Sequence, residues 1–364
     1  MSISSSRRRF VAGGHVAENQ ECDIESFLRD HAGLQPRSKI KRAFLSGGIR
    51  LNGKHVTRTR RIKTGDVVEV EMDGLYLKAE ARIAPNEKLP LVILTQTPEL
   101  VAVNKPTGQN AHPLGPSETN TAINALASRF PETALAFRPE KPLEGGLVHR
   151  IDRGTSGILV CARTREAWER IRRHWRAPSS EKVYLAWLTG ALDAAMTVEC
   201  WLARDPKSAK RMRVSPTKPL DRAAWKAETS FLTIRHTELA TLALIRIHTG
   251  VTHQIRATAQ TLGHPVAGDA VYLNEKKHHA ARIIHREPLA PATRALLESL
   301  RERISPENLG GAASAPATKI QAKAPPRTGE DAGAFLLHAL WLRVDGIEGL
   351  TAGIYCPPPG SFAR

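Results

Sequence analysis

Residues 149–162 have the sequence HRIDRGTSGILVCA, in which a charged segment leads into an apolar one. Gly154 and Gly157 allow a tight turn, and the apolar run after them predicts a buried strand. Arg150 and Asp152 are two positions apart, so an extended backbone directs both side chains to the same side. The pattern therefore predicts that Asp152 lies on a loop anchored by a buried strand. Taken alone, it also fits a structural Arg–Asp pair on a surface turn.

Further strand-like runs occur on both sides of this stretch. They cover residues 91–94, 100–103, 157–162, 183–188, 229–234 and 240–248, and helical patterns cover 121–128 and 165–175. The runs do not follow a regular βαβ alternation, which favours an α+β domain. We predict such a domain over residues 91–364, with a mixed, largely antiparallel sheet.

The N-terminal part carries the signals of a separate small module. Asp23 is placed to cap a first helix, and residues 38–45 have the apolar face of a second one. An Asn-Gly pair at 52–53 between alternating residues predicts a β-hairpin, and alternation over 68–72 predicts another strand. These signals predict an αα-β-hairpin module over residues 21–73.

The charge of the chain is strongly basic. Its 364 residues include 53 Lys and Arg against 36 Asp and Glu, a net charge of +17. Such a chain attracts polyanions, and nucleic acid is the leading candidate partner. Residues 36–65 hold ten basic residues and no acidic one, which indicates a phosphate-binding face. From this face we select six candidate RNA-binding residues: Arg37, Lys39, Lys41, Arg42, Arg50 and Lys54.

Three segments have the composition of irregular structure. We expect a basic flexible leader over residues 1–20, with a targeting segment as the alternative, and a linker over 74–90. Proline and Ala-Gly-Ser runs predict a flexible insertion over 274–334, in which residues 293–303 fit a helix.

Cysteine usage and hydropathy restrict the compartment. The four cysteines have neither the spacing of a metal site nor that of a disulfide framework, and no apolar run approaches membrane-spanning length. We therefore expect a cytoplasmic protein without a membrane segment, and a monomer.

The segment at 149–157 resembles the "HRLDRxTSG" motif of the RNA pseudouridine synthases typified by the large-subunit-rRNA enzymes. Ile151 in place of Leu is the one difference. Five more segments resemble motifs of that family in the family's order: VAVNKPTG at 101–108, EKVYLA at 181–186, GVTHQIR at 250–256, GHPVAGD at 263–269 and LHA at 337–339. In addition, GIRLNG at 48–53 is similar to a pattern of the S4-like RNA-binding module.

The resemblance implies isomerisation of uridine to pseudouridine on a base that is flipped out of its stack. Asp152 would be the catalytic carboxylate, acting as a nucleophile at C1′ or as a base at C2′. Arg256 would pair with Asp152, and Tyr184 would stack under the uracil and is a candidate for proton handling at C5. Arg150 would fill the gap left by the flipped nucleotide or contact its phosphate. No cofactor and no metal ion is expected.

The chain departs from the family pattern at two places. Val251 replaces the Arg usual after the Gly of "GRxHQIR", and the insertion at 274–334 is long. Two other functions are weighed: a non-catalytic RNA- or ribosome-binding protein that keeps the fold, and an RNA methyltransferase with the same RNA-binding module. The absence of a glycine-rich cofactor loop disfavours the methyltransferase. Large-subunit rRNA of the 23S type is the favoured substrate, and tRNA remains open.

Overall fold

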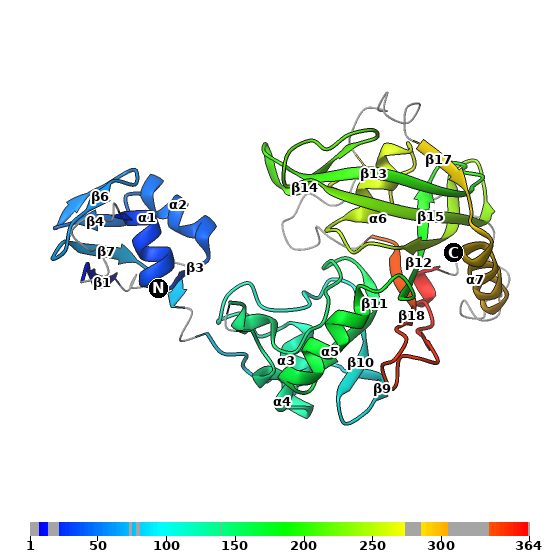
Figure 1. Ribbon diagram of the computed structural model, residues 1–364, viewed down its shortest axis with the longest axis horizontal. Coiled ribbons are helices and arrows are strands. Elements are labelled where there is room, and N and C mark those ends of the chain that lie inside the picture. Colours follow the sequence, from blue (N-terminus) through cyan, green and yellow to red (C-terminus); the bar gives the residue numbers. More distant parts are fainter. Residues whose placement is uncertain are drawn as a thin grey trace. The chain divides into compact units, whose positions relative to one another are not determined.

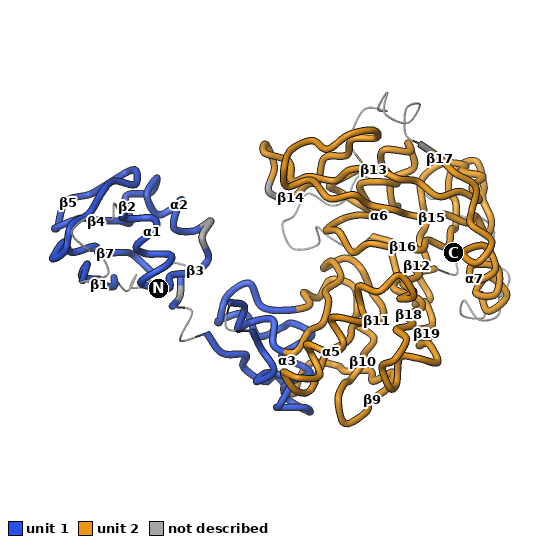
Figure 2. The backbone as a smooth tube through the Cα atoms, viewed as in Figure 1, with its two compact units in different colours: residues 1–86, 112–145 blue, residues 87–111, 146–364 orange. Residues whose placement is uncertain are grey.

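The structure is a computed structural model, and its division into two compact units is shown in Figure 2. Residues 1–86 and 112–145 form one unit, and residues 87–111 and 146–364 form the other. The residues that the structure describes are 7–13, 22–72, 75–77, 81–138, 140–273, 285–304 and 335–362.

The second unit is built on one sheet of eleven strands (Figure 1). The strands are β9 (Val92–Gln96), β10 (Leu100–Lys105), β11 (Ser156–Ala162), β12 (Glu181–Thr189), β13 (Ala195–Asp205), β14 (Ser208–Ser215), β15 (Trp225–His236), β16 (Ala240–Ile247), β17 (His285–Pro288), β18 (Leu337–Arg343) and β19 (Ile354–Tyr355). Their order is β14-β13-β15-β16-β12-β18-β11-β10-β9, with β17 on β13 and β19 on β18. Only β11 and β18 pair in parallel among these strands. The predicted α+β class with a mixed, largely antiparallel sheet is confirmed.

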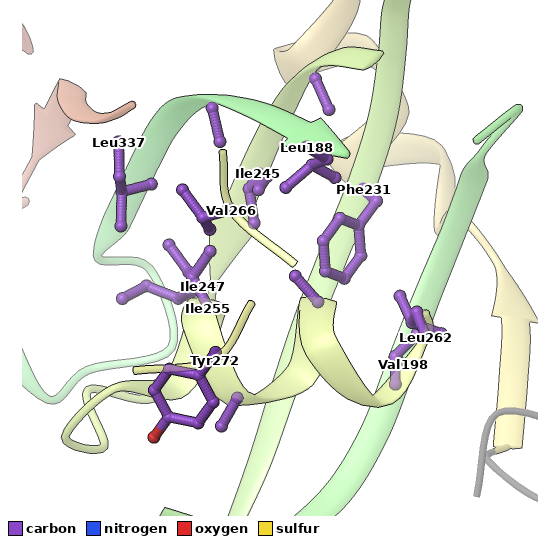
Figure 3. Close-up of a cluster of buried hydrophobic side chains, with 14 of the residues drawn as sticks. Leu188, Val198, Phe231, Ile245, Ile247, Ile255, Leu262, Val266, Tyr272 and Leu337 are labelled. Atoms are coloured by element: carbon purple, nitrogen blue, oxygen red, sulfur yellow. The ribbon is translucent and has the colours of Figure 1, made fainter. Parts of the chain in front are cut away.

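Two helices cover opposite faces of the β15–β16 part of this sheet. Successive side chains of a strand point to opposite faces, and Phe231 and Ile245 pack in the cluster that includes α6 (Gln254–Thr261). Leu232 and Leu244, their neighbours in the chain, pack with α7 (Pro291–Arg303). Figure 3 shows the α6 side, where Tyr272 lies at the edge of the apolar cluster with its hydroxyl directed away from it. At this edge of the core, the Tyr272 hydroxyl forms hydrogen bonds with polar groups.

Another helix, α5 (Arg165–Trp175), packs against β11. Its first turn is capped by Thr164, whose hydroxyl accepts a hydrogen bond of 3.1 Å from the backbone N–H of Ala167. Ile171 and Trp175 are buried in the cluster that contains the β10 and β11 side chains. The strand that follows Asp152 is thus packed into a core, as the sequence predicts.

The parallel contact between β11 and β18 requires a glycine at position 157. Gly157 has φ +105°, and a Cβ atom there would lie 2.3 Å from the carbonyl oxygen of Ala339. Only glycine combines this backbone conformation with so close an approach. The last residue of the 149–157 motif therefore lets β18 lie against β11.

The first unit contains the predicted N-terminal module. Its elements are β1 (Arg7–Val11), β2 (Cys22–Asp23), α1 (Ile24–Ser26), the π-helix η1 (Phe27–His31), β3 (Leu34–Gln35), α2 (Arg37–Leu45), β4 (Ile49–Leu51), β5 (Lys54–His55), β6 (Arg61–Ile62), β7 (Val67–Glu71) and β8 (Tyr76–Leu77). The side chain of Asp23 caps α1 by accepting a 2.8 Å hydrogen bond from the N–H of Ser26. Asn52 and Gly53, with φ of 49° and 79°, form the two-residue turn between β4 and β5. The predicted helices, hairpin and strand are all present.

Strand β1 of this module was not expected. β1 lies within residues 1–20, which the composition predicts as a flexible leader, and it pairs with β7 from Arg7 to Val11. Phe10 packs against the module's core and Ala12 is buried in it, which explains why this part of the leader is a strand. For residues 7–11 the prediction of a flexible leader is therefore wrong.

Residues 112–145 contain α3 (Ala122–Arg129), α4 (Glu132–Leu135) and the 3-10 helix η3 (Pro142–Glu144). Asn124 of α3 binds the end of the predicted linker, because its side-chain amide donates to the carbonyl of Ala84 at 2.6 Å. These residues group with residues 1–86, whereas the sequence analysis places them in the domain over 91–364. The functional division at 73 and 91 stays a prediction.

The segment at 274–334 is described only in part. α7 confirms the helix predicted over 293–303, and β17 precedes it. Residues 274–284 and 305–334 lie outside the described residues. The 3-10 helix η5 (Gly360–Phe362) follows β19. In the part of the chain that is described, no helix has the length and apolar character needed to cross a membrane.

Candidate active site

The loop that carries Asp152 is bound along its backbone to the segment after β10. The N–H of Gly108 donates to the carbonyl of Arg153 at 2.8 Å. The hydroxyl of Thr107 donates to the carbonyl of Gly154, also at 2.8 Å. These bonds hold the two residues after Asp152, so the position of its carboxylate is set by the fold.

Lys105 supports the same loop from within the core. Its ammonium group donates to the carbonyls of Pro106 and Gln109 at 2.8 Å each, and at 3.4 Å to that of Arg153. The residue is 1% exposed. Burial lowers the pKa of Lys105 to about 7, although the charge of Asp152 opposes this shift. This lysine lies in the VAVNKPTG motif at 101–108, which does not by itself predict a role for it.

The other polar residues of the motif are also bound in the core. His149 accepts a 3.0 Å hydrogen bond from the N–H of Val160 and stacks on Trp175 with ring centroids 4.3 Å apart. The hydroxyl of Ser156 lies 2.9 Å from Nδ1 of His338. The motif thus anchors the Asp152 loop to the core on both sides of the carboxylate.

Arg256, on the buried helix α6, joins two carboxylates. Its Nη1 donates to Oδ2 of Asp152 at 2.8 Å. Its Nε and Nη2 donate to Oδ2 and Oδ1 of Asp269 at 2.6 and 2.9 Å, a bidentate pair. Arg256 is 5% exposed and Asp269 is fully buried. Burial alone would lower the pKa of Arg256, but the hydrogen bonds and charges of Asp269 and Asp152 outweigh it and raise that pKa.

The predicted pairing of Asp152 with Arg256 is therefore present, while the role of Asp269 was missed. Asp269 ends the quoted GHPVAGD segment, and a buried guanidinium needs more than one partner. Aromatic rings complete the cage, since Cζ of Arg256 lies 4.4 Å from the ring centroid of Phe335 and 5.1 Å from that of Tyr272.

A pocket opens beside this pair. It is lined by Asp152, Arg256, Tyr184, Arg150 and His253 among others. Tyr184 lies on β12, and its pKa is raised, first by burial and then by the charge of Asp152, so the phenol stays neutral. Arg150 is exposed at the pocket. The three residues predicted to be catalytic, Asp152, Arg256 and Tyr184, thus line one pocket together with Arg150, which is predicted to bind RNA.

Val251 also lines the pocket, at the position where the family pattern has Arg. Its N–H donates to the side-chain oxygen of Gln254 at 3.2 Å, and its side chain packs against the apolar cluster under α6. The substitution therefore exchanges a charged side chain for apolar packing at the pocket wall.

The predicted RNA-binding residues of the N-terminal module lie in the other unit. Lys41, Arg42 and Lys54 are exposed, and Lys39 and Arg50 are partly buried. The side chain of Arg37 lies outside the described part. Nothing in the structure tests whether these residues bind RNA, so this stays a prediction.

In the described part of the chain, no group of three or more His, Cys, Asp or Glu side chains has the arrangement needed to hold a metal ion. The four cysteines are free, and Cys161, Cys200 and Cys356 are buried.

A carboxylate paired with a buried arginine at the edge of a pocket has the geometry that a general base or nucleophile requires. Comparisons with known proteins identify the family to which the chain belongs. The family model described as RNA pseudouridylate synthase matches residues 99–261.

Relatives with similar sequences align with this chain over about three quarters of their own length. Ribosomal large subunit pseudouridine synthase D of Yersinia pestis is 30% identical over 264 residues, which are 72% of this chain and 75% of the relative. Ribosomal large subunit pseudouridine synthase C of Vibrio cholerae is 34% identical over 260 residues, 68% of this chain and 76% of the relative. A solved structure of human RNA pseudouridylate synthase domain containing 1 aligns at 20% identity and a TM-score of 0.46, over 76% of this chain and 85% of that one. The chain belongs to the RNA pseudouridine synthase family, of the ribosomal large subunit type, as its motifs predict.

Proposed function

We propose that this enzyme converts one or more uridines of large-subunit rRNA to pseudouridine, with Asp152 as its catalytic carboxylate. The reaction breaks the bond between uracil N1 and ribose C1′, turns the base, and joins C5 to C1′. N1 gains a proton and C5 loses one, so the rearrangement is redox-neutral and requires no electron carrier. We therefore retain the proposal that no cofactor takes part.

The observation that carries the assignment is the hydrogen bond between Arg256 and Asp152. The 2.8 Å contact is made to Oδ2 of Asp152. In the described part of the chain, this leaves Oδ1 as the oxygen that can face a substrate. The guanidinium of Arg256 thus complements the negative charge of the carboxylate. Ionised Asp152 serves either route, attack on C1′ or removal of the C2′ proton, and the geometry leaves both open.

Tyr184 and Arg150 would act on the flipped nucleotide. Tyr184 lines the same pocket and is held neutral, which suits a ring that stacks on uracil and a hydroxyl that handles a proton at C5. Arg150 is exposed at the pocket, where it would replace the flipped base in the stack or bind its phosphate.

The proposal of an rRNA substrate is supported by the names of the relatives and by the basic N-terminal module. Both relatives described above are named for the ribosomal large subunit. The helix–helix–hairpin order and the exposed Lys41, Arg42 and Lys54 agree with an S4-like RNA-binding module. We further propose that the protein acts as a monomer in the cytoplasm.

The test is the variant Asp152→Asn, with Asp345→Asn as the matched control, since Asp345 lies on the surface. Release of tritium from RNA labelled at uridine C5 measures the reaction, because that hydrogen leaves when C5 joins the sugar. We expect no tritium release by Asp152→Asn, RNA affinity close to that of the wild type, and full activity of the control. An active Asp152→Asn protein would refute the assignment.

Mapping of pseudouridines in total RNA from cells with and without the gene tests the substrate. Loss of a site in large-subunit rRNA is expected. Loss only in tRNA would replace the proposed substrate, and no loss at any site would favour the non-catalytic alternative.

A further inference from the structure

His253 adopts a backbone conformation that is unusual for its residue type. It immediately precedes α6 with φ 55° and ψ 21°, in the left-handed region. Apart from the turn residue Asn52, it is the only non-glycine residue with positive φ in the described part of the chain. Such a conformation is strained at a non-glycine residue and is retained where the surrounding structure requires it. In this protein it directs the imidazole into the pocket, between Tyr272 and Asp152.

A chain of hydrogen bonds joins His253 to Tyr272 and to the backbone of Met212. The N–H of Met212 donates to the hydroxyl oxygen of Tyr272 at 2.9 Å. That hydroxyl lies 3.1 Å from Nδ1 of His253. The oxygen accepts from Met212, and Nδ1 lies within reach of its own proton, so we assign the hydroxyl as the donor and Nδ1 as the acceptor. Burial raises the pKa of Tyr272 to about 12, so this donor stays protonated.

The other nitrogen of His253 faces the catalytic carboxylate. Nε2 lies 3.8 Å from Oδ2 of Asp152, the oxygen that also accepts from Arg256. With Nδ1 as the acceptor for Tyr272, a neutral imidazole carries its proton on Nε2. An N–H directed at a carboxylate is attractive, whereas a lone pair there would be repulsive. An approach of roughly 1 Å makes this contact a hydrogen bond.

We propose that His253 is a positioning residue for Asp152: as the Nε2–H tautomer fixed by Tyr272, it closes onto Oδ2 when RNA binds and so directs Oδ1 at the ribose. The inference rests on the proposed role of Asp152. A neutral donor suits the task because Arg256 already supplies the positive charge. A second cation would stabilise the carboxylate further and make it a weaker nucleophile and base.

The groups around His253 support the neutral form. Burial lowers its pKa, the charges of Arg256 and Arg150 act in the same direction, and those of Asp152 and Asp269 oppose them. Arg211 of β14 also faces this region, 5.3 Å from the ring centroid of Tyr272. Protonation in acid would add a cation and make Nδ1 a donor, so the Tyr272 hydroxyl could no longer donate to it.

Three variants separate a donor role from a backbone role. Gln places an amide N–H near the position of Nε2, Asn adopts left-handed backbone more readily than Gln, and Ala supplies neither feature. If His253 donates to Asp152, single-turnover tritium release should fall about ten- to a hundredfold in His253→Ala and His253→Asn. His253→Gln should recover most of the rate, with RNA affinity within about twofold of the wild type throughout. Recovery by Asn rather than Gln would overturn the proposal.

The pH profile is a second readout that a purely structural role would not move. The wild-type rate should decline in acid at a pH below the ordinary histidine range, and His253→Gln should keep its rate to a lower pH. Superimposable acid limbs for the two proteins would contradict the proposal.

The tautomer is measured directly by ¹⁵N NMR of histidine-labelled protein at neutral pH, with His253→Gln identifying the signal. We expect an unprotonated Nδ1, and a loss of this preference in Tyr272→Phe. A protonated Nδ1 would overturn the proposal. Asp152→Asn separates the two claims: if it is active, the proposed function fails, and if it is inactive while all His253 variants match the wild type, only the role of His253 fails.

Discussion

Arg256 makes two of its hydrogen bonds with Asp269 and so has one nitrogen, Nη1, directed at the carboxylate of the pocket. Asp269 is fully buried and belongs to the segment that follows α6. The guanidinium is planar and rigid, so binding at two nitrogens determines where the third points. The geometry of Asp152 therefore depends on a carboxylate that does not itself line the pocket.

Replacing Asp269 by Asn should impair both stability and rate. The variant leaves a buried guanidinium with one carboxylate, and breaking such a pair typically costs about 3–5 kcal/mol. Arg256 is also free to rotate, so single-turnover tritium release should fall about ten- to a hundredfold with little change in RNA affinity. Urea unfolding and single-turnover kinetics measure the two effects. The control is Asp345→Asn, at a partly exposed position away from the pocket. An Asp269→Asn protein with the stability and rate of the wild type would exclude this dependence.

Replacing Gly157 by Ala should destabilise the catalytic unit severely. The added Cβ would lie 2.3 Å from the carbonyl oxygen of Ala339 at φ +105°, so β18 must move away from β11. Strain and overpacking together should cost at least about 3 kcal/mol. The midpoint of thermal unfolding measures the loss. Gly360→Ala is the control, because no atom lies within 4 Å of its Cβ position and its φ is ordinary. Equal midpoints for the two variants would show that β18 tolerates the displacement.

Local signals in the sequence predict local structure well. Asp23 caps a helix and Asn52 with Gly53 forms a two-residue turn because these residues act on atoms only a few positions away. Strand β11, which follows Asp152, is equally predictable from the sequence, because six of its seven residues are apolar or glycine and all seven are buried. These parts required no knowledge of the fold.

Long-range relationships could not be derived in this way. Asp152 and Arg256 are 104 residues apart, and only resemblance to a family predicted their pairing. The prediction omits α6 itself, since seven of its eight residues are buried and include Gln254, Arg256 and Thr258. When polar residues of a helix are buried together with its apolar ones, the sequence has no distinct apolar stripe that would predict the helix. The partners that satisfy those polar groups, such as Asp269, are visible only in three dimensions.

Removing basic side chains from the N-terminal module should weaken RNA binding in a salt-dependent way. Lys41, Arg42 and Lys54 are exposed, and each phosphate contact contributes about 0.7–0.9 to the slope of log affinity against log salt. The triple alanine variant should therefore lower affinity and reduce that slope by about 2–3. Filter binding over a range of salt concentrations measures both quantities. The control removes three exposed basic residues of the other unit, Lys226, Arg294 and Arg301. An unchanged slope in the module variant would exclude the proposed RNA contact.

The buried imidazole of His338 should make the protein sensitive to acid. His338 is fully buried on β18, where its Nε2 lies 2.9 Å from the carbonyl of Cys356 and its Nδ1 2.9 Å from the hydroxyl of Ser156. A carbonyl only accepts, so Nε2 carries the proton and Nδ1 accepts from the serine. Burial lowers the pKa of His338 to about 4, although the bond to Cys356 opposes this shift. The native state therefore holds this histidine neutral well below pH 6.5.

The sign of the pH effect follows from the lowered pKa of His338. The unfolded chain takes up a proton near pH 6.5, whereas the folded protein does so only near 4. The contribution of His338 to the free energy of unfolding is therefore fully present above pH 6.5. It falls as the pH drops to about 4, by up to about 1.4 kcal/mol per pH unit. Urea unfolding should show this decline in the wild type and a shallower one in His338→Gln, because glutamine does not titrate. His236→Gln, at an exposed position, should follow the wild type. Parallel declines in all three proteins would mean that His338 is protonated in the folded state as readily as in the unfolded chain.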